Sequence, residues 1–130
     1  MAQLLVIDDD ELVRNTLASM LSSAGHTVAT AVDGRAGTRA AATAAYDVIL
    51  VDILMPEKEG IETIIELRRR QPAIKLVAIS GGGRTDSVDF LDLAKQLGAD
   101  AALRKPIAKK RLVETVDGLL NASTGPTPRG

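Results

Sequence analysis

Short runs of apolar residues alternate along the chain with longer segments in which apolar residues recur at intervals of three and four. The short runs predict buried β-strands, and the longer spacing predicts amphipathic helices. The first helical segment, for example, carries Val13, Leu17, Met20, Leu21 and Ala24. The expected strands are residues 4–7, 26–31, 47–51, 75–79 and 99–103. The pattern therefore predicts five strands and five helices in alternation.

Strands and helices that alternate in this way predict an α/β fold with a parallel sheet and right-handed crossover connections. The uninterrupted apolar run 48–51 suits a strand that is buried on both faces of the sheet. We expect a doubly wound, five-stranded parallel sheet with strand order 2-1-3-4-5, the order of flavodoxin-like proteins. We assign residues 1–120 to one domain, and we expect residues 121–130, which lack apolar periodicity, to form a disordered tail.

Composition narrows the classes of function. The length of 130 residues suits one globular domain, and the absence of cysteine excludes disulfides, thiolate metal sites and cysteine nucleophiles. Sixteen basic and 17 acidic residues, with only Tyr46 and Phe90 aromatic, offer no basic and aromatic stripe, so we expect no direct binding of nucleic acid. No segment reads as a membrane span or as a secretory leader, so we expect a cytoplasmic protein with no membrane partner.

Polar residues follow four of the predicted strands. Asp8 and Asp9 follow the first strand, Asp52 the third, Ser80 the fourth, and Lys105 lies just beyond the fifth. The carboxyl ends of parallel strands meet at one edge of a sheet, where ligands bind in open α/β folds. In the expected order the first and third strands are neighbours about 4.8 Å apart. The three carboxylates should therefore lie together.

Such a cluster favours a cation. Two carboxylates about 4 Å apart repel each other by roughly 4 kcal/mol at an effective dielectric constant near 20, so the cluster should bind protons or a metal ion. Magnesium takes one or two protein carboxylates and keeps positions open for a phosphate oxygen. The long side chain of Lys105 can cross much of the roughly 10 Å that separates strands two apart, and the Ser80 hydroxyl can donate to phosphate. The residues therefore predict phosphoryl transfer, for which aspartate is a known nucleophile.

These residues resemble a family motif set. The segments that carry the resemblance are Leu-Leu-Val-Ile-Asp-Asp at 4–9, Asp-Ile-Leu-Met-Pro at 52–56 with Gly60, Ser-Gly at 80–81 and Lys-Pro at 105–106. Together they are similar to the receiver domain of two-component response regulators, over residues 4 to about 120. Their strength lies in five matching positions in the right order at the right strand ends.

The resemblance implies a role for each residue. Asp52 would accept a phosphoryl group from the phosphohistidine of a histidine kinase or a histidine phosphotransfer protein, and Ser80 and Lys105 would contact that group. Magnesium would be bound by Asp9 directly, by Asp8 largely through water, by Asp52 and by the backbone carbonyl of Leu54. The Lys105–Pro106 bond would be cis.

The resemblance also implies a mode of action. The protein would catalyse its own phosphorylation and dephosphorylation without being a turnover enzyme. It would signal to a downstream protein, unknown from the sequence, by changed contacts or by onward transfer.

One departure from the family pattern concerns how phosphorylation changes the surface that a partner protein contacts. Family members usually carry an aromatic switch residue on the fifth strand, where this chain has Ala102. We hypothesise that phosphorylation acts instead through the glycine run 81–83 and the start of the fourth helix, and that it changes the surface at residues 84–90.

Other interpretations remain open at this point. A haloacid-dehalogenase-type phosphatase would use Asp8 as nucleophile and Asp10 as general acid, but it would leave Asp52 without a role. A non-phosphorylated interaction module would have little reason to keep all five polar residues. We expect Asp10 to cap the first helix and assign no chemistry to His26. Lys109, Lys110 and Arg111 oppose the dipole of the last helix and form either a solvated face or a partner surface.

Overall fold

A single parallel sheet forms the centre of the molecule. The computed structural model describes residues 2–53, 59–80, 92 and 95–124. The strand order is β2-β1-β3-β4-β5, as the sequence predicts. The strands are β1 (Gln3–Ile7), β2 (Thr27–Ala31), β3 (Val48–Asp52), β4 (Lys75–Ser80) and β5 (Ala101–Arg104). Every adjacent pair is parallel, so the strands all end at one edge of the sheet.

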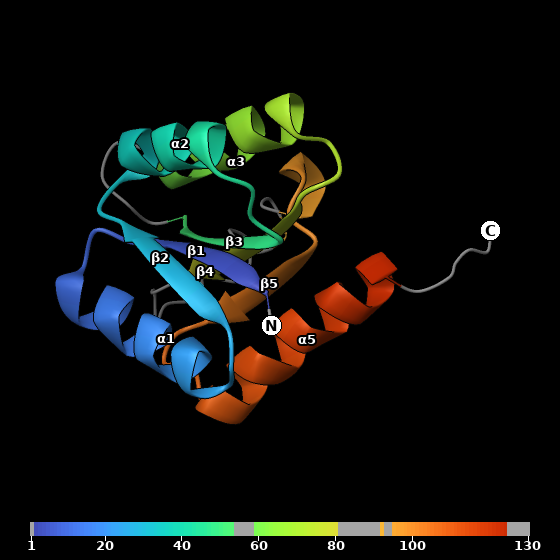
Figure 1. Cartoon of the computed structure of the whole chain (residues 1–130). Coiled ribbons are helices and arrows are strands. Elements are labelled where there is room, and N and C mark those ends of the chain that lie inside the picture. Colours follow the sequence, from blue (N-terminus) through green and yellow to red (C-terminus); the bar gives the residue numbers. More distant parts are fainter. Residues whose placement is uncertain (1, 54–58, 81–91, 93–94, 125–130) are drawn as a thin grey trace.

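Helices cover both faces of this sheet. Those with defined bounds are α1 (Glu11–Ser23), α2 (Gly34–Thr43), α3 (Glu59–Arg70) and α5 (Lys109–Thr124). Residues 92 and 95–97 are also helical, in the region where the sequence predicts the fourth of five helices. Figure 1 shows α2 and α3 on one face of the sheet and α1 and α5 on the other. The predicted α/β, doubly wound architecture is confirmed.

The core consists of two apolar layers, one on each face of the sheet. Because side chains alternate between faces along a strand, Leu5 and Ile7 pack toward α2 and α3, whereas Leu4 and Val6 pack toward α1 and α5. All five residues of β3 are buried. This explains why the central strands read as continuous apolar runs instead of alternating ones.

Aspartates start the first two helices. Asp10 precedes α1 with extended backbone geometry, and its Oδ1 accepts hydrogen bonds from the backbone nitrogens of Leu12 at 3.0 Å and Val13 at 3.3 Å. Asp33 accepts in the same way from the nitrogen of Ala36 at 2.8 Å. Each carboxylate satisfies helix amides that have no partner within the helix. The expected capping role of Asp10 is confirmed.

Gly60 sets the distance between α3 and the end of β3. A Cβ atom at this position would lie 2.5 Å from Ile53 Cα and closer still to the carbonyl oxygen of Asp52. No side chain fits there without displacing backbone atoms. The glycine therefore lets α3 pack directly against the residue that follows the third strand.

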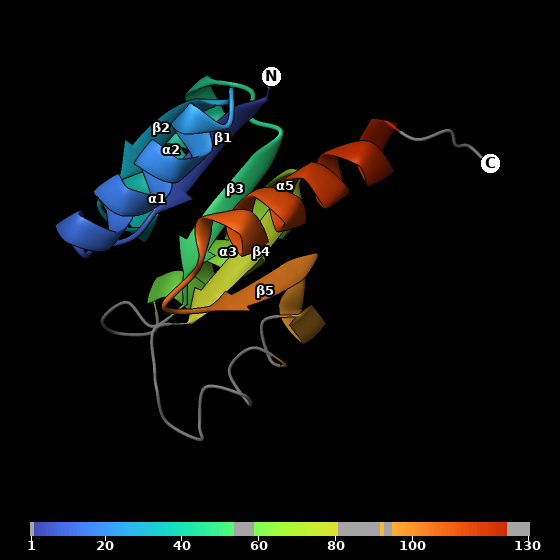
Figure 2. The same ribbon diagram turned by 90° about the horizontal axis from the view of Figure 1, so that it is seen from below.

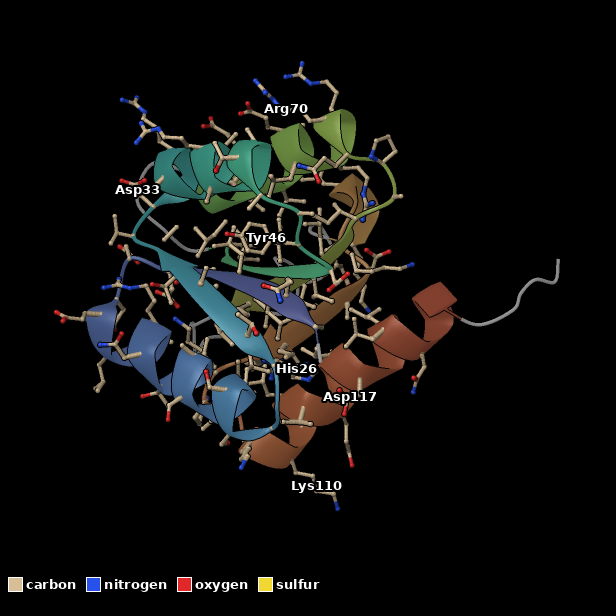
Figure 3. All side chains as sticks on the ribbon, in the orientation of Figure 1. His26, Asp33, Tyr46, Arg70, Lys110 and Asp117 are labelled. Carbon is tan, nitrogen blue, oxygen red and sulfur yellow. The ribbon has the colours of Figure 1, made fainter. Side chains whose placement is uncertain are left out.

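The amino edge of the sheet is held by two polar clusters. The buried ring of His26 accepts a hydrogen bond from the nitrogen of Ala2 at 3.2 Å and lies 3.3 Å from Asp117 on α5. Figure 3 labels His26 and Asp117, which lie near each other. On the other face, the Arg68 guanidinium donates hydrogen bonds to four groups that lie between the last turn of α3 and the starts of β4 and β5. These are the carbonyl oxygens of Pro72, Ile74 and Gly98 and the carboxylate of Asp100.

The helical boundary near the C-terminus differs from the prediction. α5 continues to Thr124, so the expected start of the tail at residue 121 is wrong by four residues. Leu119 and Leu120 pack against the core, and residues 119–124 contain neither glycine nor proline, which allows the last turn to form. Residues 125–130 lie outside the described part of the chain, and their disorder stays a prediction. Among the described helices, none is both long and apolar enough to cross a bilayer.

Candidate functional site

The carboxyl edge of the sheet brings the predicted polar residues together. The parallel strands point their ends to this edge (Figure 2), and the register pairs Ile7 with Val51 and Asp52 with Ile79. Asp8 and Asp9 follow β1, Asp52 ends β3, and one carboxylate oxygen from each of the three lies within 4.8 Å of the others. The predicted acidic cluster is therefore present in the structure.

Asp8 is fully buried, with 0% exposure. Its Oδ1 accepts a hydrogen bond from the nitrogen of Asp10 at 2.9 Å, which fixes the turn between β1 and α1. Its Oδ2 lies 3.0 Å from Lys105 Nζ as an ion pair but lacks the alignment of a hydrogen bond. Asp8 is thus a buried carboxylate with one oxygen that is ion-paired but makes no hydrogen bond.

Lys105 joins the outermost strand to the centre of the site. Its ammonium lies 3.2 Å from Asp52 Oδ2, and both partner carboxylates are nearly inaccessible to solvent. Burial on its own would lower the pKa of this ammonium, but the negative charges of Asp52 and Asp8 outweigh burial and raise its pKa above the ordinary value. Lys105 therefore stays charged at neutral pH. The backbone of Lys105 is held next to the end of β4, because its nitrogen donates a hydrogen bond to the Ser80 carbonyl at 2.8 Å.

Ser80 lies next to the acidic cluster. It ends β4, one residue beyond the partner of Asp52 in the β3–β4 register, and it is fully buried. Its Oγ has no hydrogen-bond partner within the described residues. A buried hydroxyl without a partner is costly, by about 1–3 kcal/mol, unless a ligand uses it. The position suits a donor to a phosphoryl oxygen.

The chemistry of the cluster fits a hard divalent cation. Three carboxylates face one ammonium, so negative charge remains uncompensated, and all the available ligand atoms are oxygens, which Mg²⁺ prefers. Asp8 Oδ2 is buried without a hydrogen bond, which also favours a bound cation at this position. Asp8, Asp9 and Asp52 are the described residues that could hold the ion. Leu54, whose carbonyl is expected to complete the set, lies outside the described residues.

Two residues shape the site through contacts that the sequence does not reveal. Arg14 on α1 donates from Nη1 to the Asp8 carbonyl at 2.9 Å and so holds the turn that carries the acidic pair. Gly60 is part of the motif set, but its close approach to the Asp52 carbonyl becomes visible only when α3 is placed. An arginine six residues after a strand-end aspartate has many possible partners, so spacing alone could not identify this contact.

The remaining sequence predictions have mixed outcomes. The Lys105–Pro106 peptide bond is cis, as expected. Ala102 is partly buried against the apolar layer on the α2 and α3 face. The hypothesis for residues 81–90 lies outside the described part of the chain. The phosphatase alternative gains no support, because the carboxylate of Asp10 is used as a helix cap.

Comparison with known proteins decides the family. The family model of the response regulator receiver domain matches residues 4–117. The chain belongs to the response regulator receiver family. A receiver domain is a signalling module of two-component systems and not a turnover enzyme.

The chain resembles one part of several longer regulators. It is 30% identical over 125 residues to the DNA-binding transcriptional regulator NtrC of Azospirillum brasilense, with coverage of 96% of this chain and 25% of that protein. It is 32% identical over 123 residues to the transcriptional regulatory protein CpxR of Klebsiella pneumoniae, with coverage of 95% of this chain and 51% of that protein. The receiver therefore spans about a quarter to about half the length of these curated relatives.

A solved receiver domain has the same fold. The receiver domain of NtrX from Brucella abortus superimposes with a TM-score of 0.85 at 28% identity, over 91% of this chain and 98% of that one. The doubly wound sheet and the helices around it are therefore those of a receiver.

Proposed function

We propose that this receiver accepts a phosphoryl group on Asp52 from the phosphohistidine of a histidine kinase or a histidine phosphotransfer protein. The supporting observation is the convergence of Asp8, Asp9 and Asp52, whose carboxylate oxygens lie within 4.8 Å, with the Lys105 ammonium 3.2 Å from Asp52. Asp52 ends the central strand, so it is the carboxylate flanked on both sides by other site residues. It is therefore the acceptor that its neighbours can best assist.

The transfer step is a simple exchange of bonds. A carboxylate oxygen of Asp52 attacks phosphorus, an O–P bond forms, and the N–P bond of the donor histidine breaks with its electron pair returning to the imidazole nitrogen. Lys105 neutralises charge on the phosphoryl oxygens, and Ser80 Oγ donates a hydrogen bond to one of them. When bound by Asp8, Asp9 and Asp52, Mg²⁺ supplies further charge neutralisation to the transferred group. Positioning and charge carry the reaction, so no general base is needed.

The surface beside the site suits a protein donor. A groove of about 600 Å³ runs between α1 and residues 105–107, and its lining is mostly apolar. The side chain of Leu12, which lines this groove, is 76% exposed and adds apolar surface to it. A helical partner docked on this groove would bring its phosphohistidine to the carboxyl edge. The changed contacts after transfer, or onward transfer to a second histidine, would carry the signal.

Labelling with a small phosphodonor tests the proposal. Acetyl phosphate with Mg²⁺ should add a single phosphoryl group to the protein, detected by intact mass spectrometry, and Asp52→Asn should abolish the addition. Asp8→Asn is the matched control, because it removes a neighbouring carboxylate and leaves the acceptor in place, so labelling should be slowed and not redirected. Labelling that survives in Asp52→Asn and disappears in Asp8→Asn would instead support the phosphatase chemistry.

A further inference from the structure

A groove between α2 and α3 has no role in the chemistry described above. Its volume is about 470 Å³, and it lies on the face of the sheet where these two helices are neighbours (Figure 1). Arg35 and Arg39 line it from α2, and Glu62 and Glu66 line it from α3. In both pairs the residues are four positions apart, so they share one face of their helix. We call this feature the α2–α3 groove.

The charges of the groove are sorted by helix. Arg35 and Arg39 are the charged residues of α2, and both are exposed. The wall that α3 contributes carries Glu62 and Glu66 along its first turns, with Arg70 one turn further on. One wall is therefore positive, and the facing wall is negative over most of its length.

These opposite charges do not pair with each other across the groove. Among the described residues, Glu66 forms an ion pair at 3.0 Å with Arg70 of its own helix, and no ion pair involves Arg35, Arg39 or Glu62. Arg35 also lies in the first turn of α2, which contains no acidic residue, and a cation there repels the helix dipole. Stability within the molecule does not explain this arrangement, and the charges are available to an external partner.

The charged pairs match in direction and in spacing. The strands β2, β3 and β4 are parallel, and α2 and α3 each return across the same face of the sheet to the start of the next strand, so the two helices run parallel. Arg35 and Glu62 lie in the first turn of their helices. The second charge of each helix follows four residues later, an axial rise of about 6 Å in both. Each wall is therefore a match for the other in register.

This register allows one kind of symmetric pairing between two copies of the chain. A two-fold axis along the groove, parallel to both helices, places α2 of each copy over α3 of the other, with arginines opposite glutamates. An axis across the helices would instead place α2 over α2 and bring arginines against arginines, which repel. Charge therefore selects the axis that runs along the groove.

We propose that the α2–α3 groove is an interface with a second copy of this chain, in which the two arginines of each α2 pair with the two glutamates of the facing α3. A small anion would be repelled by the glutamates and a small cation by the arginines, whereas a second copy presents the opposite charge to each wall. Ile65 on α3, three positions from Glu62, is 44% exposed and adds apolar surface beside the glutamates.

The size of the interface sets its strength. The helices have 10 and 12 residues and are about 15 and 18 Å long, which is short for an interface between stable dimers. The surface is also mostly charged, so salt screens the attraction. The dimer is therefore weak, and it forms at high protein concentration and low ionic strength.

Sedimentation velocity on the unphosphorylated protein tests the proposal. At low salt the weight-average sedimentation coefficient should rise with protein concentration, and added salt should return it to the monomer value. Arg35→Glu and Glu62→Arg should each lower the dimer association constant on the order of tenfold, because the symmetry brings like charges together twice. An equimolar mixture of the two variants should recover association, since each altered charge then faces an opposite one.

Matched controls apply the same charge changes to the other face of the sheet. Lys110 and Glu114 are exposed on α5, and Figure 3 shows Lys110 pointing away from the sheet. Lys110→Glu and Glu114→Arg should leave the association constant unchanged. Loss of association in these variants would place the contact on α5 and overturn the proposal.

Three further results would also overturn it. A sedimentation coefficient that does not depend on concentration would show that the chain stays monomeric. Association that persists in both groove variants, or that the mixture does not recover, would exclude pairing between α2 and α3. Amide shifts confined to the α2–α3 groove when inorganic phosphate is added to a monomeric protein would assign the groove to an anionic ligand. None of these outcomes bears on phosphorylation of Asp52, which the labelling experiment tests separately.

Discussion

At the scale of single residues, Lys105 is the group on which the site depends most. Its ammonium contacts Asp8 at 3.0 Å and Asp52 at 3.2 Å, and so it stabilises two buried carboxylates that would otherwise repel each other. The same contacts place it in competition with any metal ion for the same oxygens. Lys105 should therefore weaken metal binding in the resting protein and assist transfer once the phosphoryl group arrives.

Replacement of Lys105 separates its effect on metal binding from its effect on phosphoryl transfer. In Lys105→Met we expect Mg²⁺ to bind about tenfold more tightly, because a competing positive charge is removed, while phosphorylation by acetyl phosphate becomes slower. Calorimetric titration measures the first effect and mass spectrometry the second. Lys75→Met, at the amino end of β4 and far along the strand from the site, is the control and should change neither. An unchanged Mg²⁺ affinity in Lys105→Met would contradict the competition.

The protonation of Lys105 gives a prediction for alkaline pH. The ordinary pKa of lysine is about 10.4, and in this site Asp52 and Asp8 raise it against the effect of burial. A raised pKa in the folded state means that the stabilisation is complete below about pH 10.4 and is lost as pH rises through the folded-state value. NMR titration of the Lys105 side-chain nitrogen should show the raised value, and Asp52→Asn should lower it. Identical titration midpoints of Lys105 in the wild type and in Asp52→Asn would show that the charge of Asp52 does not raise the pKa of Lys105.

The sequence predicts the residues of the site better than their contacts. Asp8, Asp9 and Asp52 could be placed together because strand ends share an edge and the strand order brings β1 beside β3. The double contact of Lys105 could not, because it depends on which rotamers the long side chain adopts. The same limit applies to Arg14, whose backbone acceptor at Asp8 leaves no pattern in the sequence.

At the scale of elements, the packing of α3 on the end of β3 controls the position of Asp52. Gly60→Ala would drive a methyl group into Ile53 and the Asp52 carbonyl, so we expect a loss of about 1–3 kcal/mol in the free energy of unfolding, together with slower phosphorylation. Gly118→Ala in α5 is the matched control. No atom lies within 4 Å of a Cβ there, so helix propensity should stabilise the protein by about 1 kcal/mol. Urea denaturation compares the two, and equal stabilities would exclude a tight contact at Gly60.

The exposed end of α1 gives a second test at this scale. Leu12→Asp removes apolar surface from the groove beside the site without changing a site residue. We expect phosphoryl transfer from a cognate histidine kinase to fall about tenfold, with transfer from acetyl phosphate unchanged. Ile65→Asp places the same charge at an exposed apolar position of α3, on the opposite face of the sheet, and should leave both rates unchanged. Equal kinase rates in wild type and Leu12→Asp would place the docking surface elsewhere.

Hydrophobic periodicity predicts the existence and the type of the elements but not their ends. β5 begins at Ala101, whereas the apolar run begins at 99. Asp100, just before the strand, has its carboxylate bonded to the nitrogen of Leu76 and to Arg68, contacts that lie outside any local pattern. The end of α5 is likewise decided by packing of Leu119 and Leu120 against a core that the sequence does not display.

At the scale of the whole molecule, Arg68 connects the end of α3 to the turns that lead into the paired strands β4 and β5. Its guanidinium holds the end of α3, the turn before β4 and the segment before β5. Arg68→Met should therefore reduce the free energy of unfolding by about 2 kcal/mol, because the partly buried carbonyl groups of Ile74 and Gly98 lose a charged donor. Arg69→Met, at the exposed neighbouring position, should change it by less than about 0.5 kcal/mol. Chemical denaturation measures both, and similar values would show that the cluster contributes little.

The strand order has a consequence for biosynthesis. Asp8, Asp52, Ser80 and Lys105 lie at the ends of four different strands, and the contact between Lys105 and Asp52 spans 53 positions of the chain. A chain emerging from the ribosome presents its acidic residues early but lacks the ammonium until β5 has been made and has docked at the edge of the sheet. If Asp52 is the acceptor, nascent or truncated chains cannot be phosphorylated efficiently. A kinase then transfers its phosphoryl group only to receivers whose folding is complete.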